Sequence, residues 1–400
     1  MRVAVVAGPD PGHAFPAIAL CLKFQAAGDE PTLLTGEEWL DTARSAGVDA
    51  VLLEGLDPVD GDDDDDAGAK IHRRAARMAV LNTPVLRELA PDLVVSDVIT
   101  ACGGMAAELL GLPWVELCPH PLYQPSKGLP PVGSGLAPGI GLLGGVRDAV
   151  MRALTARSVR AGDRQRLAAR AEIGLPAHGV APLRRLIATL PALEVPRPDW
   201  PAEAVVVGPL HFEPTETVLE VPDGTGPVVV VAPSTATTGT TGLAELALES
   251  LVPGETLPTG ARVVVSRLGG ERRDGEGAGG SDVTVPPWAV VGLGRQDELL
   301  THADLVVCGG GHGMVSKTLL AGVPMVVVPG GGDQWEIANR VVRQGSGELI
   351  RPLTGDALRT AAGRVLASSR YRERARLAGG GITDVTDPVR VCHDALTGPR

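Results

Sequence analysis

Short runs of β-branched residues alternate with helical stretches along almost the whole chain. The run RVAVVAG at 2–8 is typical of a buried strand, and apolar residues then follow at helical spacing until Gly28. Further strands are expected at PTLLTG, AVLLEG, DLVVSD and WVELC, and long helices over 69–89 and 145–171. Strands that alternate with helices form parallel sheets covered on both faces. The pattern therefore restricts the chain to an α/β fold.

The alternation is interrupted by a Pro- and Gly-rich segment at 195–227 that holds one short strand. Strands then return as VVVVAP, ARVVVS, WAVVG, ADLVVCGG and PMVVVPG. The length of 400 residues suits two domains. We expect two doubly wound parallel-sheet domains: an N-terminal domain over 1–200, a linker region over 201–226, and a C-terminal domain over 227–384, with a helix over 385–400 returning to the first domain. Such sheets bind ligands at the carboxyl ends of their strands, so we expect the site in the cleft between the domains.

Charge and composition argue against several classes of partner. The formal net charge is −12, whereas phosphate backbones are bound by clustered Lys and Arg, so no nucleic-acid partner is expected and an anionic membrane is disfavoured. The start MRVAVVAGPD lacks the regions of a signal peptide, and its apolar run is too short to span a bilayer. The five cysteines lie far apart without a CxxC pair, which argues against zinc and disulfides. A cytoplasmic protein without a transmembrane segment is expected, and nothing in the sequence indicates its oligomeric state.

The longest acidic run is DPVDGDDDDDAG at 57–68. Adjacent aspartates repel one another, which favours a mobile, solvated loop over a cation site. A calcium loop would interleave its acids with a glycine turn and a distant Glu, and this run does not. No metal site is therefore expected.

The stretch ADLVVCGGGHGMVSKTLLAGVPMVVVPGGGDQ at 303–334 carries the strongest functional signal. Gly309 to Gly311 lack side chains, so a ligand can approach the backbone closely. A helix beginning near His312 would present free N–H groups and a partial positive charge, which together form an anion site. Tight packing of a strand on a helix also requires small residues, so the glycines alone leave that alternative open.

A second glycine-rich mouth follows the next strand. Asp333 and Gln334 stand at the start of a helix there, with a carboxylate and an amide suited to sugar hydroxyls. Asp333 could equally cap that helix, and the two roles are compatible. Ser234 and Thr235 end the first strand of the second half and offer further hydroxyl and N–H groups, although a solvated Thr-rich turn would look the same.

Two residues of the first half are candidates for proton transfer. His13 follows the first strand, and an imidazole with a pKa near ~6.5 suits a general base at neutral pH. Asp97 ends the strand PDLVVSD, and the mouth there faces the same sheet edge as His13. A catalytic histidine needs such a carboxylate to fix its tautomer. The alternatives are a polar loop histidine and an N-cap aspartate.

These motifs together resemble the actinobacterial natural-product glycosyltransferases of glycosyltransferase family one. The similarity rests on CGGGHGM, the GVP at 322–324, Pro329, the DQ pair, the ANR at 338–340, the segment VVGLGRQDELLTHADLVV and the N-terminal GPDPGHAFP, and in coarse order it covers nearly the whole chain. The resemblance implies the glycosyltransferase-B fold, an α/β architecture of two facing Rossmann-like domains. Gly309 replaces the family's usual His, and Met314 its usual Thr or Ser, so phosphate binding would depend on backbone N–H groups.

The resemblance implies an inverting glycosyltransferase that moves a hexose from a nucleotide-diphosphate sugar to a hydroxyl of a small natural-product or lipid-like acceptor. His13 would be the base, Asp97 its partner, and His120 part of the acceptor pocket. The donor, a UDP- or dTDP-sugar, would act as co-substrate without a metal or other cofactor. Its expected binding residues are Ser234, Thr235, Gln296, Gly310, Gly311, His312, Gly313, Asp333 and Gln334.

Three other hypotheses remain open from the sequence. The same fold could serve a nucleotide-sugar epimerase or hydrolase, in which no acceptor enters. The replacements at Gly309 and Met314 also fit a non-catalytic, degenerate transferase that acts as an auxiliary partner. A dinucleotide oxidoreductase is disfavoured because the first turn reads AGPDPGHA and lacks G-x-G-x-x-G.

Overall fold

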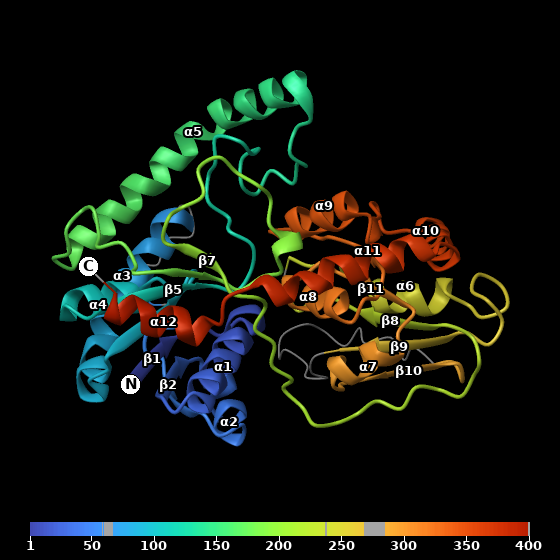
Figure 1. Ribbon diagram of the computed structural model, residues 1–400, viewed down its shortest axis with the longest axis horizontal. Coiled ribbons are helices and arrows are strands. Elements are labelled where there is room, and N and C mark those ends of the chain that lie inside the picture. The colour runs from blue at the N-terminus through green and yellow to red at the C-terminus, as the bar shows by residue number, and fades with distance from the viewer. Residues whose placement is uncertain (58, 60–66, 237, 268–284, 399–400) are drawn as a thin grey trace.

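The computed structural model describes residues 1–57, 59, 67–236, 238–267 and 285–398. The aspartate run at 62–66 lies outside the described residues. Two α/β halves lie side by side (Figure 1), each built on one parallel sheet. This confirms the expected fold class. No helix among the described ranges is long and apolar enough to cross a membrane.

The first half contains a seven-stranded sheet in the order β3-β2-β1-β4-β5-β6-β7. Its elements are β1 (Arg2–Val6), α1 (Pro11–Ala26), β2 (Glu30–Thr35), α2 (Glu37–Ser45), β3 (Asp49–Leu52), α3 (Ala67–Leu89), β4 (Leu93–Asp97), α4 (Cys102–Leu110), β5 (Trp114–Cys118), α5 (Gly141–Glu172), β6 (Arg185–Ile187), the 3₁₀ helix η1 (Pro191–Leu193) and β7 (Ala204–Val206). The short strand expected inside the Pro-rich segment is β7, and it pairs with β6 as the last strand of this sheet.

The second half contains a six-stranded sheet in the order β10-β9-β8-β11-β12-β13. Its elements are β8 (Val228–Ala232), α6 (Leu243–Ser250), β9 (Arg262–Ser266), β10 (Ala289–Gly292), α7 (Gln296–His302), β11 (Leu305–Cys308), α8 (His312–Leu320), β12 (Met325–Val327), α9 (Gln334–Gln344), β13 (Gly347–Leu349), α10 (Gly355–Ala367), α11 (Ser369–Gly380), the 3₁₀ helix η2 (Gly381–Asp384) and α12 (Pro388–Thr397).

Both sheets reverse their strand order next to their first strand. In the first sheet β1 pairs with both β2 and β4, and in the second β8 pairs with both β9 and β11. Loops that leave such neighbouring strands in opposite directions open a crevice at the carboxyl edge of the sheet. The segments after β1 and β4, and after β8 and β11, are therefore the positions where each half can hold a ligand.

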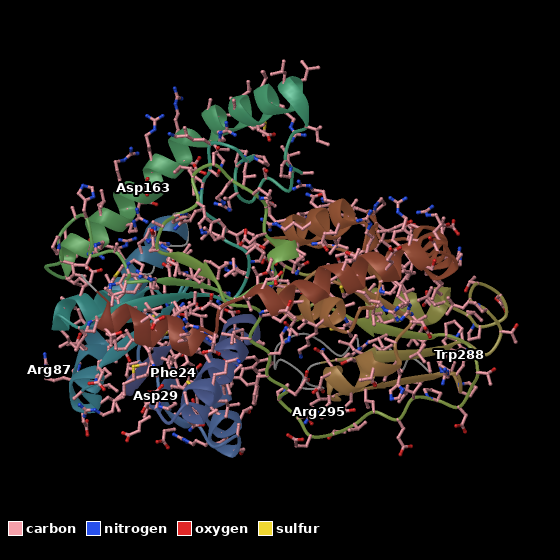
Figure 2. The ribbon with its side chains drawn as sticks, in the orientation of Figure 1. Phe24, Asp29, Arg87, Asp163, Trp288 and Arg295 are labelled. Atoms are coloured by element: carbon pink, nitrogen blue, oxygen red, sulfur yellow. The ribbon has the colours of Figure 1, made fainter. Side chains whose placement is uncertain are left out.

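The C-terminal helix α12 packs against α1 of the first half (Figure 1). Asp29 follows α1 and contacts α12, because its carboxylate lies 2.8 Å from His393 Nε2. The same carboxylate lies 2.8 Å from the Met1 ammonium. Phe24 is fully buried in the core of this half and is labelled close to Asp29 in Figure 2. The chain thus crosses between the halves and returns.

Candidate active site

The two halves enclose a cleft of about 330 Å³, which is within the usual size of a small-molecule site. Most of the residues expected from the sequence line it: His13, His120, Ser234, Thr235, Gln296, Gly311, His312, Gly313, Asp333 and Gln334. Asp97 lies behind His13, in contact with it but not in the lining. The cleft therefore brings together residues from distant parts of the chain.

His13 lies in the first turn of α1, directly after β1, and Asp97 ends β4, the neighbouring strand. The His13 Nδ1 and Asp97 Oδ2 atoms are 2.7 Å apart, and Asp97 is only 1 % exposed. The other oxygen of Asp97 accepts hydrogen bonds from the backbone of Ile99 and from Thr100. Asp97 thus organises the turn that follows β4 and also pairs with the histidine.

The charge environment favours the protonated form of His13. Burial lowers the pKa of His13, but the charge and the hydrogen bond of Asp97 act against burial. The carboxylates of Asp10 and Asp333 add to the effect, so the net pKa of His13 is raised above its usual value. Because Asp97 receives the Nδ1 proton, the Nε2 lone pair is the one that can accept a proton.

His120 forms an aromatic wall beside this pair. Its ring centroid lies 5.9 Å from that of His13, edge to face, and 4.5 Å from that of Tyr123, in a stacked arrangement. Its Nδ1–H donates to the Pro121 carbonyl at 2.7 Å. Burial, with a contribution from the charge of His13, lowers the pKa of His120. His120 therefore presents a neutral, flat surface to the cleft.

The glycine loop after β11 approaches the loop after β8 very closely. Gly310 has a φ of +84°, a conformation that side-chain-bearing residues rarely adopt. A Cβ on Gly309 would lie 2.8 Å from the Ser234 Cβ and 3.1 Å from its backbone nitrogen. The helix α8 then begins at His312, with Gly311 as N-cap and no side chain capping it. Its first amides therefore remain available to an anion in the cleft.

Gln334 holds these loops together. Its amide nitrogen donates to Ser234 Oγ at 2.8 Å, and its amide oxygen accepts from the Gly330 backbone at 2.8 Å. Gln334 is 2 % exposed, so its amide is occupied by protein contacts. Asp333 stands at the N-cap position of α9, but its side chain makes no cap hydrogen bond to the helix, and its carboxylate lines the cleft.

The His312 side chain reaches across to the first half. Its Nε2 lies 2.8 Å from the Thr189 hydroxyl, and the ring also donates to the Pro119 carbonyl. Burial is the main reason that the pKa of His312 is well below its usual value, and neighbouring positive charges such as Arg340 act in the same direction. His312 is thus a neutral link between the halves.

No protein-family model matches the chain. The 4'-demethylrebeccamycin synthase of Lentzea aerocolonigenes is 26% identical over 412 aligned residues, which cover 94% of this chain and 94% of that protein. The zeaxanthin glucosyltransferase of Pseudescherichia vulneris is 26% identical, with 87% of this chain and 85% of that protein covered. Both relatives match over most of their length.

Solved structures agree in fold. The glycosyltransferase of kitacinnamycin has a TM-score of 0.75 at 21% identity, and the match covers 99% of this chain and 98% of that protein. A Streptomyces glycosyltransferase complexed with thymidine diphosphate has a TM-score of 0.67 at 19% identity, and the match covers 98% of this chain and 99% of that protein. The chain is a glycosyltransferase of the glycosyltransferase-B fold. It is related to the actinobacterial natural-product transferases, as the motifs indicated.

The cleft of this transferase also contains an ion pair that the sequence analysis missed. Lys317 Nζ lies 2.6 Å from Glu213 Oε1 and 3.1 Å from the side-chain oxygen of Gln296. The other Glu213 oxygen accepts from the Gln296 backbone at 3.1 Å. This arrangement fixes the side-chain oxygen of Gln296, one of the residues expected to bind the donor. Glu213 lies in the Pro-rich segment, where no periodic pattern relates it to α8.

A second residue that the sequence analysis missed, His211, lies beside this pair. Its Nε2 is 2.9 Å from the Ser316 hydroxyl. Burial and the nearby Lys317 ammonium lower the pKa of His211 to about 3, so the ring is neutral. Among the described residues, no group of three or more His, Cys, Asp or Glu side chains could hold a metal ion.

Proposed function

We propose that this transferase inverts the anomeric centre of a hexose as it moves the sugar from a nucleotide-diphosphate donor to an acceptor hydroxyl. The observation that carries the proposal is the 2.7 Å contact between His13 Nδ1 and Asp97 Oδ2 at the edge of a cleft whose opposite wall is the N-terminus of α8. A base and an anion site that face one cleft suit a direct displacement.

In the proposed reaction, His13 Nε2 takes the proton of the acceptor hydroxyl. The hydroxyl oxygen bonds to the anomeric carbon while the bond from that carbon to the phosphate oxygen breaks, and the nucleoside diphosphate leaves with the electron pair. Asp97 is a positioning residue, because it holds the Nδ1 proton and stabilises the imidazolium that forms. A single displacement inverts the configuration.

The donor would bind to the second half. Backbone amides at Gly311 to Gly313 and the dipole of α8 would stabilise the growing charge of the diphosphate, so we propose a reaction without a metal ion. The carboxylate of Asp333 suits the sugar hydroxyls, and the amide nitrogen of Gln296 suits a carbonyl oxygen of a pyrimidine base. The thymidine diphosphate held by the Streptomyces transferase supports a dTDP- or UDP-sugar.

The acceptor would be a small hydroxylated natural product bound against the first half, beside His120. The names of the relatives, a demethylrebeccamycin synthase and a zeaxanthin glucosyltransferase, support this class. We propose that the transferase acts in the cytoplasm, because its five buried cysteines are free thiols, as a reducing compartment would maintain them.

The substitution His13→Ala tests the role of the base. The rate of sugar transfer should fall by about 10² to 10⁴, while the dissociation constant for thymidine diphosphate, measured by calorimetry, should not change. The exposed His178→Ala serves as a matched control and should transfer at the wild-type rate. Transfer by the His13 variant at the wild-type rate would remove His13 from the mechanism.

A further inference from the structure

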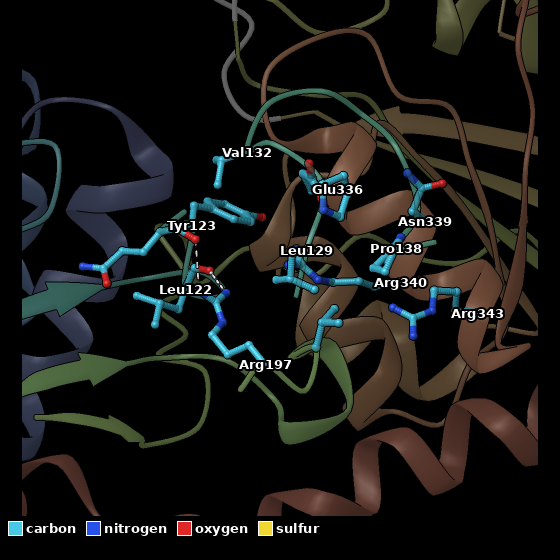
Figure 3. A pocket seen from close by; sticks show the side chains of 13 residues that line it. Leu122, Tyr123, Leu129, Val132, Pro138, Arg197, Glu336, Asn339, Arg340 and Arg343 are labelled. Carbon is cyan, nitrogen blue, oxygen red and sulfur yellow. Dashed lines mark hydrogen bonds between the residues drawn. The ribbon is translucent and has the colours of Figure 1, made fainter. Parts of the chain in front are cut away.

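A second, smaller pocket lies between the halves (Figure 3). We call it the arginine pocket and define it by Tyr123, Leu129, Arg197, Glu336, Arg340 and Arg343. Tyr123 and Leu129 come from the loop after β5, Arg197 follows η1, and the other three lie on α9. Its volume is about 20 Å³, which is room for one or two water molecules or for the two oxygens of a carboxylate.

The arginine pocket contains buried donors that have no acceptor. Arg340 is 6 % exposed, and neither its Nε nor its Nη1 has a hydrogen-bond partner in the described part of the chain. The same holds for the Tyr123 hydroxyl and for Arg197 Nε. Burial of a guanidinium without a partner is unfavourable, because the group loses its hydration and gains nothing in return.

The carboxylates near the arginine pocket are engaged elsewhere. Glu194 accepts from the backbone of Leu122 at 2.6 Å and of Val195 at 3.3 Å. Glu336 hydrogen-bonds the backbone of the loop after β5. No ion pair joins either of them to Arg340 among the described residues, and the Arg340 guanidinium lies 5.3 Å from the Tyr123 ring centroid. The protein therefore offers these donors no acceptor, and a bound ligand could provide one.

The chemistry of the missing group follows from these donors. A planar guanidinium with two unpaired N–H edges, beside a phenol hydroxyl and a second guanidinium, matches the planar oxygens of a carboxylate. A carboxylate adds a charge attraction to these hydrogen bonds that a neutral carbonyl does not supply.

The arginine pocket and the cleft that contains the proposed base lie on either side of the stacked Tyr123 and His120 rings. Tyr123 stacks on His120, and the edge of His120 faces His13. The two pockets have no lining residue in common, so an acceptor that reaches both His13 and Arg340 must pass the edge of these rings. We propose that the arginine pocket binds a carboxylate group of the acceptor; the acceptor part of this inference rests on the proposed function.

Binding of a free carboxylate is tested by thermal unfolding with formate, and with formamide as its neutral counterpart. Formate at about ten times its dissociation constant should raise the melting temperature of the wild type by about 2 °C, and formamide should not. Arg340→Met should abolish the formate effect. Arg87→Met, an exposed arginine of the first half labelled in Figure 2, should keep it. If formate raised the melting temperature of Arg340→Met as much as that of the wild type, formate binding in the arginine pocket would be ruled out.

Tyr123→Phe is a second variant, which tests the pocket even if Arg340→Met does not fold. It removes only the hydroxyl and should weaken formate binding several-fold while the protein stays folded. Unchanged formate affinity in both Tyr123→Phe and Arg340→Lys would overturn the assignment of the donors.

The acceptor part is tested by calorimetry on protein saturated with thymidine diphosphate, with para-coumarate and its methyl ester as probes. The acid should bind at least about tenfold more tightly than the ester to the wild type, which corresponds to one charge-assisted contact, and about equally to Arg340→Met. Equal binding of acid and ester to the wild type would show that the pocket takes only free anions and would overturn the acceptor part. Failure of the proposed function would look different: no sugar transfer to any hydroxyl, with formate still bound.

Discussion

At the switch point of the first sheet two side chains meet, whereas at the switch point of the second sheet the contacts are made by backbone and by a buried amide. His13 and Asp97 pair across β1 and β4, while Gly309 lies against Ser234 across β11 and β8. The topology is the same in both halves. The difference shows that the same sheet edge can provide a histidine–aspartate pair or a backbone turn without side chains, depending on which residues follow the strands.

Two histidines of the cleft show the same contrast. His13 has a carboxylate partner, so its pKa is raised, whereas His312 has a hydroxyl and a carbonyl as partners and burial lowers its pKa. A partner with negative charge stabilises the imidazolium, and a neutral partner in a buried site does not. As pH falls, protonation of His13 should therefore stabilise the fold, whereas protonation of His312 should destabilise it.

The largest effect is expected from Asp97→Asn. The oxygen of the new amide would keep the turn at Thr100, but its NH₂ group would donate to His13 Nδ1 and force the ring proton onto Nε2, the atom proposed as base. The rate of transfer should fall by about 10² to 10⁴, with unchanged affinity for thymidine diphosphate. Asp92→Asn, at a carboxylate that accepts from the Arg2 backbone, is the control. A fully active Asp97 variant would mean that the pair is structural.

Next comes Gly310→Ala in the opposite half. A Cβ there would lie 2.9 Å from Val327 Cγ1 on a backbone with φ +84°, which costs about 1–3 kcal/mol. The affinity for thymidine diphosphate should fall by at least about tenfold, because the loop that leads into α8 must move. Gly363→Ala, in a helix where a Cβ meets nothing within 4 Å, should leave affinity unchanged. Equal affinity in both variants would show that the loop does not set the anion site.

The pH dependence of stability is the third test. His312 has a lowered pKa in the folded state, so its contribution to the free energy of unfolding is present above pH ~6.5 and is lost as pH falls below that value. His312→Gln should remove about 1–2 kcal/mol of this acid sensitivity between pH ~7 and ~5. His13 acts in the opposite sense: its raised pKa stabilises the fold below pH ~6.5, and this stability is lost as pH rises through the folded pKa. Denaturant unfolding at several pH values measures both.

The smallest effect concerns the pH profile of transfer. The base must be unprotonated, so kcat/KM should fall as pH drops through the raised pKa of His13, which lies above ~6.5. Asp10→Asn removes one carboxylate that raises this pKa and should move the midpoint to lower pH. A midpoint that moves upward, or a profile without an acid limb, would contradict the role of His13.

Some strands and loop contacts could not be read from the sequence. The strand β6 has only three residues, too few to show a period of two, and it was not expected. The short strand β7 was expected inside the Pro-rich segment, but nothing in the sequence assigned it to the edge of the first sheet. Gln334 was expected to offer its amide to a sugar, but in the structure that amide joins Ser234 to Gly330. The partners of a polar side chain depend on loops from distant parts of the chain.

The sequence by itself determined the α/β class, the two halves and the strand ends that carry the site, because apolar periodicity and glycine turns are local properties of a chain. Only the tertiary structure decided which polar groups meet: His13 with Asp97, His312 with Thr189 across the cleft, and two Arg340 nitrogens with no acceptor in the described part of the chain. The physical reason is that hydrogen bonds and charge interactions act over a few ångströms. They are therefore set by how the two sheets and their loops pack. The spacing of residues along the chain does not determine which of these groups come within contact distance.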